Sequence, residues 1–455
     1  MKLHKTLTIA AIAVAAAIPA TAQNTYSGYF IDGNLYRHQL NPAFANEYNY
    51  FAFPGLGNMN IGMHGNLHVR DVLYNVNGKT TTFLNPGVDA ATFLGSLHDS
   101  NKVGVDINIP ILAGGFNAWG GYNTVSINAR ARVDASLPRS IFSLLKEGIE
   151  NTSYDISNLR AHADAYAEIA FGHSRQINDR WRVGGKLKFL IGAGNVDMYL
   201  DRADLTLGED NWTAVTDARI RSSVKGLSYK TEVNDHTGHR YVSGAEVHGT
   251  GVNGFGIGID LGGEFKLNDD WRFSAAILDF GFISWGNDVL ATTDGVQTFE
   301  TDRYTFSANG DAGNSFDNEW NRMRDELSAL YELNDKGNVG GRTTMLATTL
   351  NFAGEYTFPY YRPLTFGVLN STRIAGKFTS TSFRFSANVA PVKLFSGGIN
   401  FAAGTYGCSF GWMLNLHPRW FNFFLAMDHT LGRLAKQGVP LSSNASINMG
   451  INFPF

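Results

Sequence analysis

The stretch from Ser446 to Phe455 is the part of the sequence that most constrains the fold, because apolar and polar residues alternate along it. Every second residue is Ile, Met or Phe, and the residues between them are Ser, Asn, Gly and Pro. Successive side chains of a β-strand point to opposite faces, so the stretch predicts a strand with one apolar and one polar face. Such a strand fits a barrel wall or a sheet with one buried face.

The same alternation recurs along the chain, for example in residues 60–69, 125–134 and 161–171. We expect about 14 such strands, near residues 59–69, 101–116, 122–135, 161–176, 181–199, 252–267, 271–285, 344–358, 364–377, 381–390, 395–404, 407–416, 420–430 and 445–455. Single-chain barrels of outer membranes prefer an even number of strands. The sequence therefore predicts an all-β, transmembrane, antiparallel up-and-down β-barrel.

Composition supports a membrane barrel. The chain has 50 Gly and 32 Phe but only 17% charged residues, below the roughly 25% of soluble domains. No segment reaches about 18 uncharged apolar residues, so no transmembrane helix is predicted. The 40 acidic and 37 basic side chains give no sign of nucleic-acid binding, and the single Cys408 excludes an internal disulfide. A secreted β-sandwich is the alternative fold.

The first 22 residues have the pattern of a secretory signal peptide. Lys2 and Lys5 precede an apolar run over residues 7–18, and small residues follow at positions 20–22. This pattern predicts secretion through the general pathway, with cleavage before Gln23. We therefore divide the chain into a signal peptide (1–22), an N-terminal segment (23–58) and a barrel (59–455).

Three very short polar turns, at 177–181, 267–271 and 416–420, end in Trp181, Trp271 and Trp420. Each Trp stands where the returning strand is expected to begin, which predicts an interfacial aromatic girdle at one rim. The connections at 70–100, 137–160, 201–250 and 287–343 are long and rich in loop residues, with short helices expected at 90–97, 138–147 and 318–330. We expect all short turns at the periplasmic rim and the long loops outside.

The final strand and the N-terminal segment resemble known barrels. A strand that alternates and ends in Phe453 and Phe455 resembles the signal that the barrel-assembly machinery recognises. The triplet Asn41, Pro42 and Ala43, placed between signal peptide and first strand, resembles a motif of barrels related to the FadL-type long-chain fatty-acid transporters. Within that group the chain looks most similar to Bacteroidota barrels, which include PorV-like type IX secretion components and a family of unknown function. The resemblance implies that the N-terminal segment plugs the lumen; a tail across the periplasmic mouth is the alternative.

Charged and polar residues on the expected inner face are the candidate lumen residues: His64, His68, Arg130, Arg132, Asp164 and Glu168. Lys186 and Lys188 fall on the next strand, so that positive, negative and positive rows would lie side by side. Opposite charges on neighbouring strands attract. The rows are either ion pairs that stiffen the wall or a polar surface that holds the plug or a ligand head group.

No pattern of residues points to an enzyme, a cofactor or a metal. His64 and His68 would stand about 13 Å apart on a strand, too far for one ion. Residues 249–254 match G-x-G-x-x-G, but they precede a strand and open no helix, unlike a nucleotide-binding loop. Two functions remain open: a barrel that passes a small apolar ligand, and a docking or secretion partner of the PorV-like kind. The expected partners are membrane lipid, the assembly machinery, and either that ligand or a secretion partner.

Overall fold

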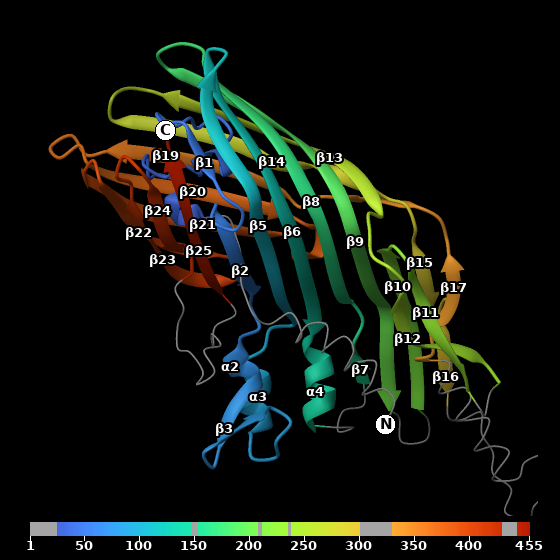
Figure 1. Cartoon of the computed structure of the whole chain (residues 1–455). Coiled ribbons are helices and arrows are strands. Elements are labelled where there is room, and N and C mark those ends of the chain that lie inside the picture. Colours follow the sequence, from blue (N-terminus) through green and yellow to red (C-terminus); the bar gives the residue numbers. More distant parts are fainter. Residues whose placement is uncertain (1–24, 148–152, 208–211, 235–237, 301–329, 430–443) are drawn as a thin grey trace, which may run out of the picture.

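The computed structural model describes residues 25–147, 153–207, 212–234, 238–300, 330–429 and 444–455. Within these residues 14 antiparallel strands form a closed β-barrel, so the predicted fold class and strand count are confirmed (Figure 1). The expected signal peptide and nearly all of the expected helix at 318–330 lie outside the described residues.

The wall strands follow one another around the barrel in chain order. They are β2 (Met59–Gly65), β5 (Ser100–Ala118), β6 (Gly121–Pro138), β8 (Leu159–Gln176), β9 (Trp181–Leu207), β13 (Gly254–Lys266), β14 (Trp271–Trp285), β19 (Thr348–Thr357), β20 (Leu364–Ile374), β21 (Ser380–Val392), β22 (Phe395–Gly404), β23 (Gly407–Leu416), β24 (Asn422–Met427) and β25 (Ala445–Pro454). The barrel closes where β2 pairs with both β25 and β5, with Ile61 opposite Ile447 and Ile107. The short β1 (Tyr50–Ala52) lies between the same two strands.

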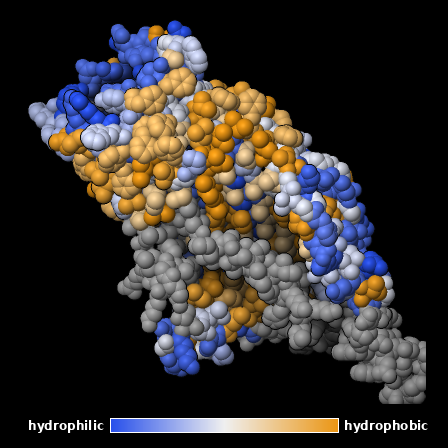
Figure 2. Space-filling model, in the orientation of Figure 1, coloured by the Kyte–Doolittle hydropathy of each residue, from blue (hydrophilic) through white to orange (hydrophobic). Residues whose placement is uncertain are grey.

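Alternation separates an apolar outer face from a polar inner face. In β9, Leu187 and Phe189 are exposed on the outside, whereas Lys186 and Lys188 are buried inside. Figure 2 shows a band of apolar side chains across the visible face of the barrel. Because side chains that face lipid must be apolar, this band accounts for the period-two pattern of the sequence.

Short turns join the strands at one end, here called the short-turn end. They lie at 119–120, 177–180, 267–270, 358–363, 393–394 and 417–421, and β25 also ends there. The expectation that every connection at the other end is long was wrong. The β20–β21 connection, which holds the 3₁₀ turn η4 (Gly376–Phe378), and the two-residue β22–β23 turn lie at this long-loop end. Gly376 and Gly407, with φ of 57° and 90°, allow these tight reversals.

The connections 201–250 and 287–343 contain strands where the sequence suggested loops. Strand β9 runs on to Leu207 and pairs with β10 (Trp212–Val224). The other added strands are β11 (Leu227–Val233), β12 (Arg240–Val247), β15 (Val289–Thr292), β16 (Gln297–Glu300), β17 (Asn334–Asn338) and β18 (Arg342–Met345). Strands β17 and β18 are mostly polar, and Thr216 and Ser222 interrupt the apolar face of β10, so these strands lack the long apolar face of a lipid-facing strand.

A small folded region stands at the long-loop end (Figure 1). It contains α2 (Val69–Val72), β3 (Leu73–Val76), β4 (Lys79–Thr82), α3 (Ala90–Gly95), α4 (Arg139–Glu147) and β7 (Ser153–Asp155). Helices α3 and α4 match two of the expected helices, and their residues Phe93 and Phe142 belong to one apolar cluster with Phe83. Among the described residues, no helix has the length and apolarity needed to cross a membrane.

Candidate functional site: the barrel interior and the N-terminal segment

Residues 25–49, the described part of the N-terminal segment that precedes β1, make few regular elements yet are largely buried. The 3₁₀ turns η1 (Tyr26–Gly28) and η2 (Arg37–Gln39) are its only helices. Its aromatic side chains pack on one another, and the ring of Tyr29 lies 5.3 Å from that of Phe44. Other apolar side chains of the segment pack on the wall, and the ring of Tyr36 lies 5.7 Å from that of Phe424 on β24. The segment therefore meets the wall through apolar contacts as well as through polar groups.

Inward side chains from strands around the barrel bind the backbone of this segment. Asp428, which follows β24, accepts hydrogen bonds from the backbone N–H groups of Tyr26 and Ser27. Four further side chains donate to backbone oxygens: Asn422 to Gly33 (3.1 Å), Lys186 to His38 (3.3 Å), Asn351 to Leu40 (2.9 Å) and Ser174 to Ala43 (2.6 Å). These donors stand on β24, β9, β19 and β8, so the wall holds the segment from several sides.

The Asn41-Pro42-Ala43 triplet forms a tight turn against β9 and β13. The Asn41 side chain accepts the Ala43 N–H at 2.9 Å and donates to the carbonyl of Gly263 at 3.2 Å. A Cβ at Gly184 would collide with the carbonyl of Pro42, and one at Gly262 with the Asn41 side chain. The two glycines thus form the seat on which the triplet rests, a fit that the sequence alone did not reveal.

His38 is a buried residue of the N-terminal segment, and Lys186 of β9 binds its backbone oxygen. Its side chain is only 4% exposed, and Nε2 lies 2.8 Å from the Tyr50 hydroxyl. Burial, and then the positive charge of Lys186, hold the pKa of His38 well below its ordinary value of 6.5. The ring is therefore neutral at pH 7.

The predicted charge rows meet as one ion-pair network. Arg130 on β6 contacts Glu168 on β8 at 2.8 Å, and Lys188 on β9 lies 3.8 Å from the same carboxylate. Sequence reasoning missed two acids that complete the network, Asp260 on β13 and Asp279 on β14, which lie 2.7 and 2.5 Å from the Lys188 ammonium.

The sequence pattern could have identified one of these two acids but not the other. Asp260 is in phase with the inward Gly262 and Glu264, so the alternation of β13 could have found it. Asp279 lies where the register between β13 and β14 shifts, and its φ of 57° breaks the alternation. A bulge of this kind leaves no period-two signal.

A second network lies nearer the long-loop end. His64 contacts Asp134 at 3.0 Å, and Arg132 pairs with the same carboxylate. Arg373 holds Asp106 through two hydrogen bonds of 2.5 and 2.8 Å. Among the other predicted lumen residues, Asp164 pairs with His162 at 2.8 Å.

The placement of His68 on the inner face of the first strand was wrong. Strand β2 ends at Gly65, so His68 stands in the connection before α2, and its backbone N–H binds Asp71 at 2.8 Å. The alternation ran on by coincidence, because Leu67 packs in the apolar cluster of the folded region and not against lipid.

The expected girdle residues lie at the short-turn end. Trp181 and Trp271 begin β9 and β14, whereas Trp420 lies in the turn before β24; the three are 48%, 41% and 82% exposed. Of the two terminal aromatics, Phe453 packs 5.7 Å from the ring of Phe51, and Phe455 is 70% exposed.

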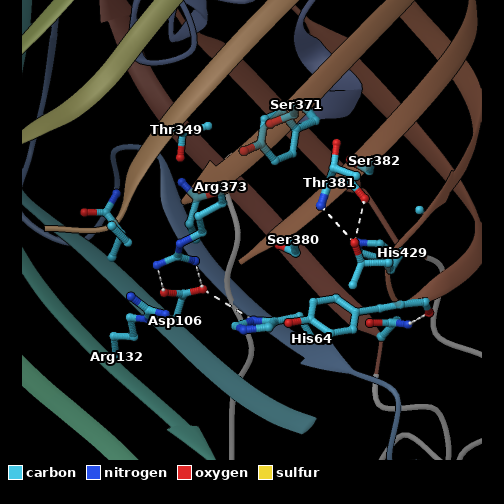
Figure 3. A pocket seen from close by; sticks show the side chains of 18 of the residues that line it. His64, Asp106, Arg132, Thr349, Ser371, Arg373, Ser380, Thr381, Ser382 and His429 are labelled. Atoms are coloured by element: carbon cyan, nitrogen blue, oxygen red, sulfur yellow. Dashed lines mark hydrogen bonds and ion pairs between the residues drawn. The ribbon is translucent and has the colours of Figure 1, made fainter. Parts of the chain in front are cut away.

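A cavity of about 120 Å³ opens inside the barrel next to Tyr26 of the N-terminal segment (Figure 3). Its charged lining comes from the two networks and from the Asp164–His162 pair: Asp106, Arg130, Arg132, Asp164, Asp279 and Arg373. Hydroxyl groups on β19, β20, β21 and β23 also line it, among them Thr349, Ser371, Ser380, Ser382 and Ser409. Among the described residues, no group of three or more His, Cys, Asp or Glu side chains is arranged to hold a metal ion.

Comparison with known proteins gives a family and a set of solved structures. The model of a family of unknown function, DUF5723, matches residues 42–428. No curated protein matches the chain. Similar solved structures include the Pseudomonas putida toluene transporter TodX (9% identity, TM-score 0.39, covering 91% of this chain and 92% of that one) and the Ralstonia pickettii toluene transporter TbuX (10%, 0.42, 92% and 92%). A third is a Pseudomonas aeruginosa FadL homologue (11%, 0.35, 96% and 97%).

Proposed function

We propose that this chain, which belongs to the DUF5723 family, is an outer-membrane barrel that passes a small molecule through a lumen closed by its N-terminal segment. The observation that carries the proposal is the hold of the wall on residues 26–43 from β8, β9, β19 and β24. In this proposal the segment is a plug, the short-turn end faces the periplasm, and the long-loop end faces outward.

The plug meets the wall through apolar packing and through hydrogen bonds, and water can replace the hydrogen bonds. Three of these join backbone oxygens to the neutral side chains of Asn422, Asn351 and Ser174. The charged side chains of Asp428 and Lys186 make the others described above. A hydrogen bond exchanged for one with water costs only about 0.5–1.5 kcal/mol net. Lys186 lies 3.8 Å from Asp260, so this charge keeps a partner when the plug shifts. Residues near His38 can therefore move without stranding Lys186, whereas release of Tyr26 and Ser27 would take away the hydrogen-bond donors of the buried Asp428 carboxylate.

A disulfide lock tests the movement. The side chains of Ser27 and Asn400 touch, with Asn400 Nδ2 2.9 Å from Ser27 Oγ. In a Cys408→Ala background, Ser27→Cys with Asn400→Cys should form a bond that fixes the plug to β22. Single-channel conductance in planar bilayers should be low when the pair is oxidised and should rise on reduction. The single variant Ser27→Cys is the control, and equal conductance in both redox states would contradict gating by the plug.

In the transport hypothesis drawn from the sequence, the ligand is small and apolar, but the Asn41-Pro42-Ala43 triplet does not identify a substrate. Such a ligand would meet charged pairs in the cavity, and covering polar groups without hydrogen bonds is costly. Uptake of a long-chain fatty acid into proteoliposomes, compared between the oxidised and reduced lock, tests this part of the proposal. Uptake that is absent in both states would remove the apolar ligand and leave the gated lumen intact.

A docking or secretion partner is the second candidate function. The folded region at the long-loop end favours it, because the buried Phe83, Phe93 and Phe142 give this region a core of its own. A surface with a core keeps a fixed shape, as a binding partner requires. Replacement of residues 69–97 by a short linker should leave conductance unchanged. A transport defect in this variant would count against the docking function.

A further inference from the structure

The cavity beside the plug has two chemically different walls. Strands β5, β6, β8, β14 and β20 supply the charged side chains, and strands β19, β20, β21 and β23 supply neutral hydroxyls. Figure 3 shows Asp106, Arg132 and Arg373 of the first group and Thr349, Ser371, Ser380 and Ser382 of the second. A ligand that binds here must satisfy both walls at once. We propose that the cavity binds a small, neutral molecule that carries several hydroxyl groups, such as a monosaccharide or another polyol.

The charged side chains that line the cavity are already paired with one another or with neighbouring side chains, which disfavours an ionic ligand. Arg373 lies 2.5 Å from Asp106, Arg130 lies 2.9 Å from Asp279, and Asp164 lies 2.8 Å from His162. Arg132 is paired with Asp134. An anion would have to compete with carboxylates already in place, and a cation would have to compete with guanidinium groups. A neutral hydroxyl can use the remaining lone pairs and N–H groups without breaking any pair.

The neutral wall has hydrogen-bonding capacity left over. Within the described part of the chain, the hydroxyls of Thr349, Ser380 and Ser382 make no hydrogen bond, and all three line the cavity. Each hydroxyl is both a donor and an acceptor, so it pairs best with a group that is also both. A ligand hydroxyl meets this condition, whereas an apolar ligand would leave these groups desolvated without partners.

The size and the apolar parts of the lining fit a compact molecule. A cavity of about 120 Å³ is well above the roughly 10–15 Å³ that a single water needs, so it has room for a small molecule. The side chains of Tyr26, Tyr166 and Tyr406 and the small Ala402 and Ala403 give the cavity surfaces for a carbon skeleton. A few polar groups that fix orientation on such surfaces are typical of small-molecule sites.

This assignment rests on the proposed function only in taking the bound molecule to be one that the barrel passes. Binding itself can be measured at equilibrium with the plug in place. Saturation-transfer NMR on the full-length protein in detergent would use four probes: glucose, gluconate, glucosamine and toluene. We expect transfer to glucose, and an affinity for the two charged sugars lower by about tenfold or more, because each must displace an ion-pair partner.

Loss of hydroxyls from the neutral wall should weaken binding of glucose. The double variant Ser380→Ala and Ser382→Ala should lower the affinity by about fivefold or more, at about one net hydrogen bond per site. Thr372→Ala is the matched control, because its hydroxyl lies on β20 but does not line the cavity. Heat-modifiable gel mobility shows that each variant remains a folded barrel.

Three results would overturn the assignment: no transfer to glucose, tighter binding of gluconate, glucosamine or toluene than of glucose, or an equal loss in the Thr372→Ala control. If glucose binds but the disulfide lock has no effect on conductance, the site stands and gated passage fails. If the lock works and glucose does not bind, gating stands and the polyol assignment fails.

Discussion

The carboxylate of Asp428 holds the backbone of Ser27, accepting both its N–H and its hydroxyl, although the two residues are 401 positions apart. Asp428 is fully buried, and it also accepts the N–H of Tyr26 at 2.9 Å. One side chain next to the penultimate wall strand therefore fixes the start of the described N-terminal segment. The contact makes Asp428 the natural place to weaken the plug.

Asp428→Asn should loosen the plug without removing bulk. Hydrogen bonds to a charged acceptor contribute about 1.5–3 kcal/mol each, and the amide keeps only part of that strength. We expect the open fraction in planar-bilayer recordings to rise about tenfold or more. Asp269→Asn, in the exposed β13–β14 turn, is the matched control and should leave the recordings unchanged. A variant of Asp428 that conducts like the intact protein would show that this contact does not hold the plug closed.

Gly184→Ala should unseat the Asn41-Pro42-Ala43 turn. The new methyl group would overlap the backbone carbonyl of Pro42, and overpacking of this kind costs about 1–3 kcal/mol. Arg37, which is buried in the intact protein, should then become open to trypsin. Gly185→Ala on the same strand is the control, because the nearest atom to its methyl group is a side-chain carbon 3.6 Å away. Equal rates of cleavage after Arg37 in both variants would argue against the seat.

Lys188→Met should destabilise the whole barrel. It leaves Asp260 and Asp279 buried without the ammonium that lies 2.7 and 2.5 Å from them. Loss of one partner from a buried ion pair costs about 3–5 kcal/mol. The urea midpoint of unfolding in lipid vesicles measures the effect, with Lys266→Met, at the exposed end of β13, as the control. A midpoint that does not move would mean that the network adds nothing to stability and favours a role toward ligand.

Whether a strand could be predicted from the sequence depended on its surroundings in the folded protein. Lipid demands an unbroken apolar face, so β25 and β9 were evident from residues 446–455 and 181–199. Strand β10 pairs with the extension of β9 and carries Arg219 and Arg221, whose side chains are 50% and 36% exposed, so the same test overlooked it. The alternation of apolar and polar residues therefore identifies strands that contact lipid and misses other strands.

The interior was predicted less completely for a different reason. Arg130 and Glu168 stand on neighbouring strands in phase, and simple alternation placed both inside. The seat of Pro42 needs Gly184, which lies far along the chain and is one of 50 glycines. Only the folded backbone shows which glycine makes room for which turn, so contacts of this kind stay hidden in a single sequence.

Deletion of Phe455 should reduce assembly more than it reduces stability. The residue is 70% exposed, and its backbone N–H binds Asn49 at 3.0 Å, so little packing is lost. If the terminal aromatic serves as an assembly signal, the yield of heat-modifiable barrel in the membrane should fall several-fold. The protein that does insert should unfold at the urea concentration of the intact chain. A normal yield would remove the signal function, and a large shift in midpoint would make Phe455 structural.

The plug should loosen as the pH falls below about 6.5, because of His38. Burial and the charge of Lys186 keep its pKa well below that value while the plug is seated. Once the plug is released, the ring regains an ordinary pKa near 6.5 and takes up a proton. The contribution of His38 to seating is therefore complete above pH 6.5 and declines as the pH drops, by up to about tenfold in the seating equilibrium per pH unit.

Conductance recorded from pH 8 to pH 5 should rise over the lower part of this range. His38→Gln keeps a donor for the Tyr50 hydroxyl but cannot titrate, so its conductance should stay flat over the same range. A rise that persists in His38→Gln would assign the pH response to another group, and a flat profile in the intact protein would show that the ring does not leave its site when the barrel conducts.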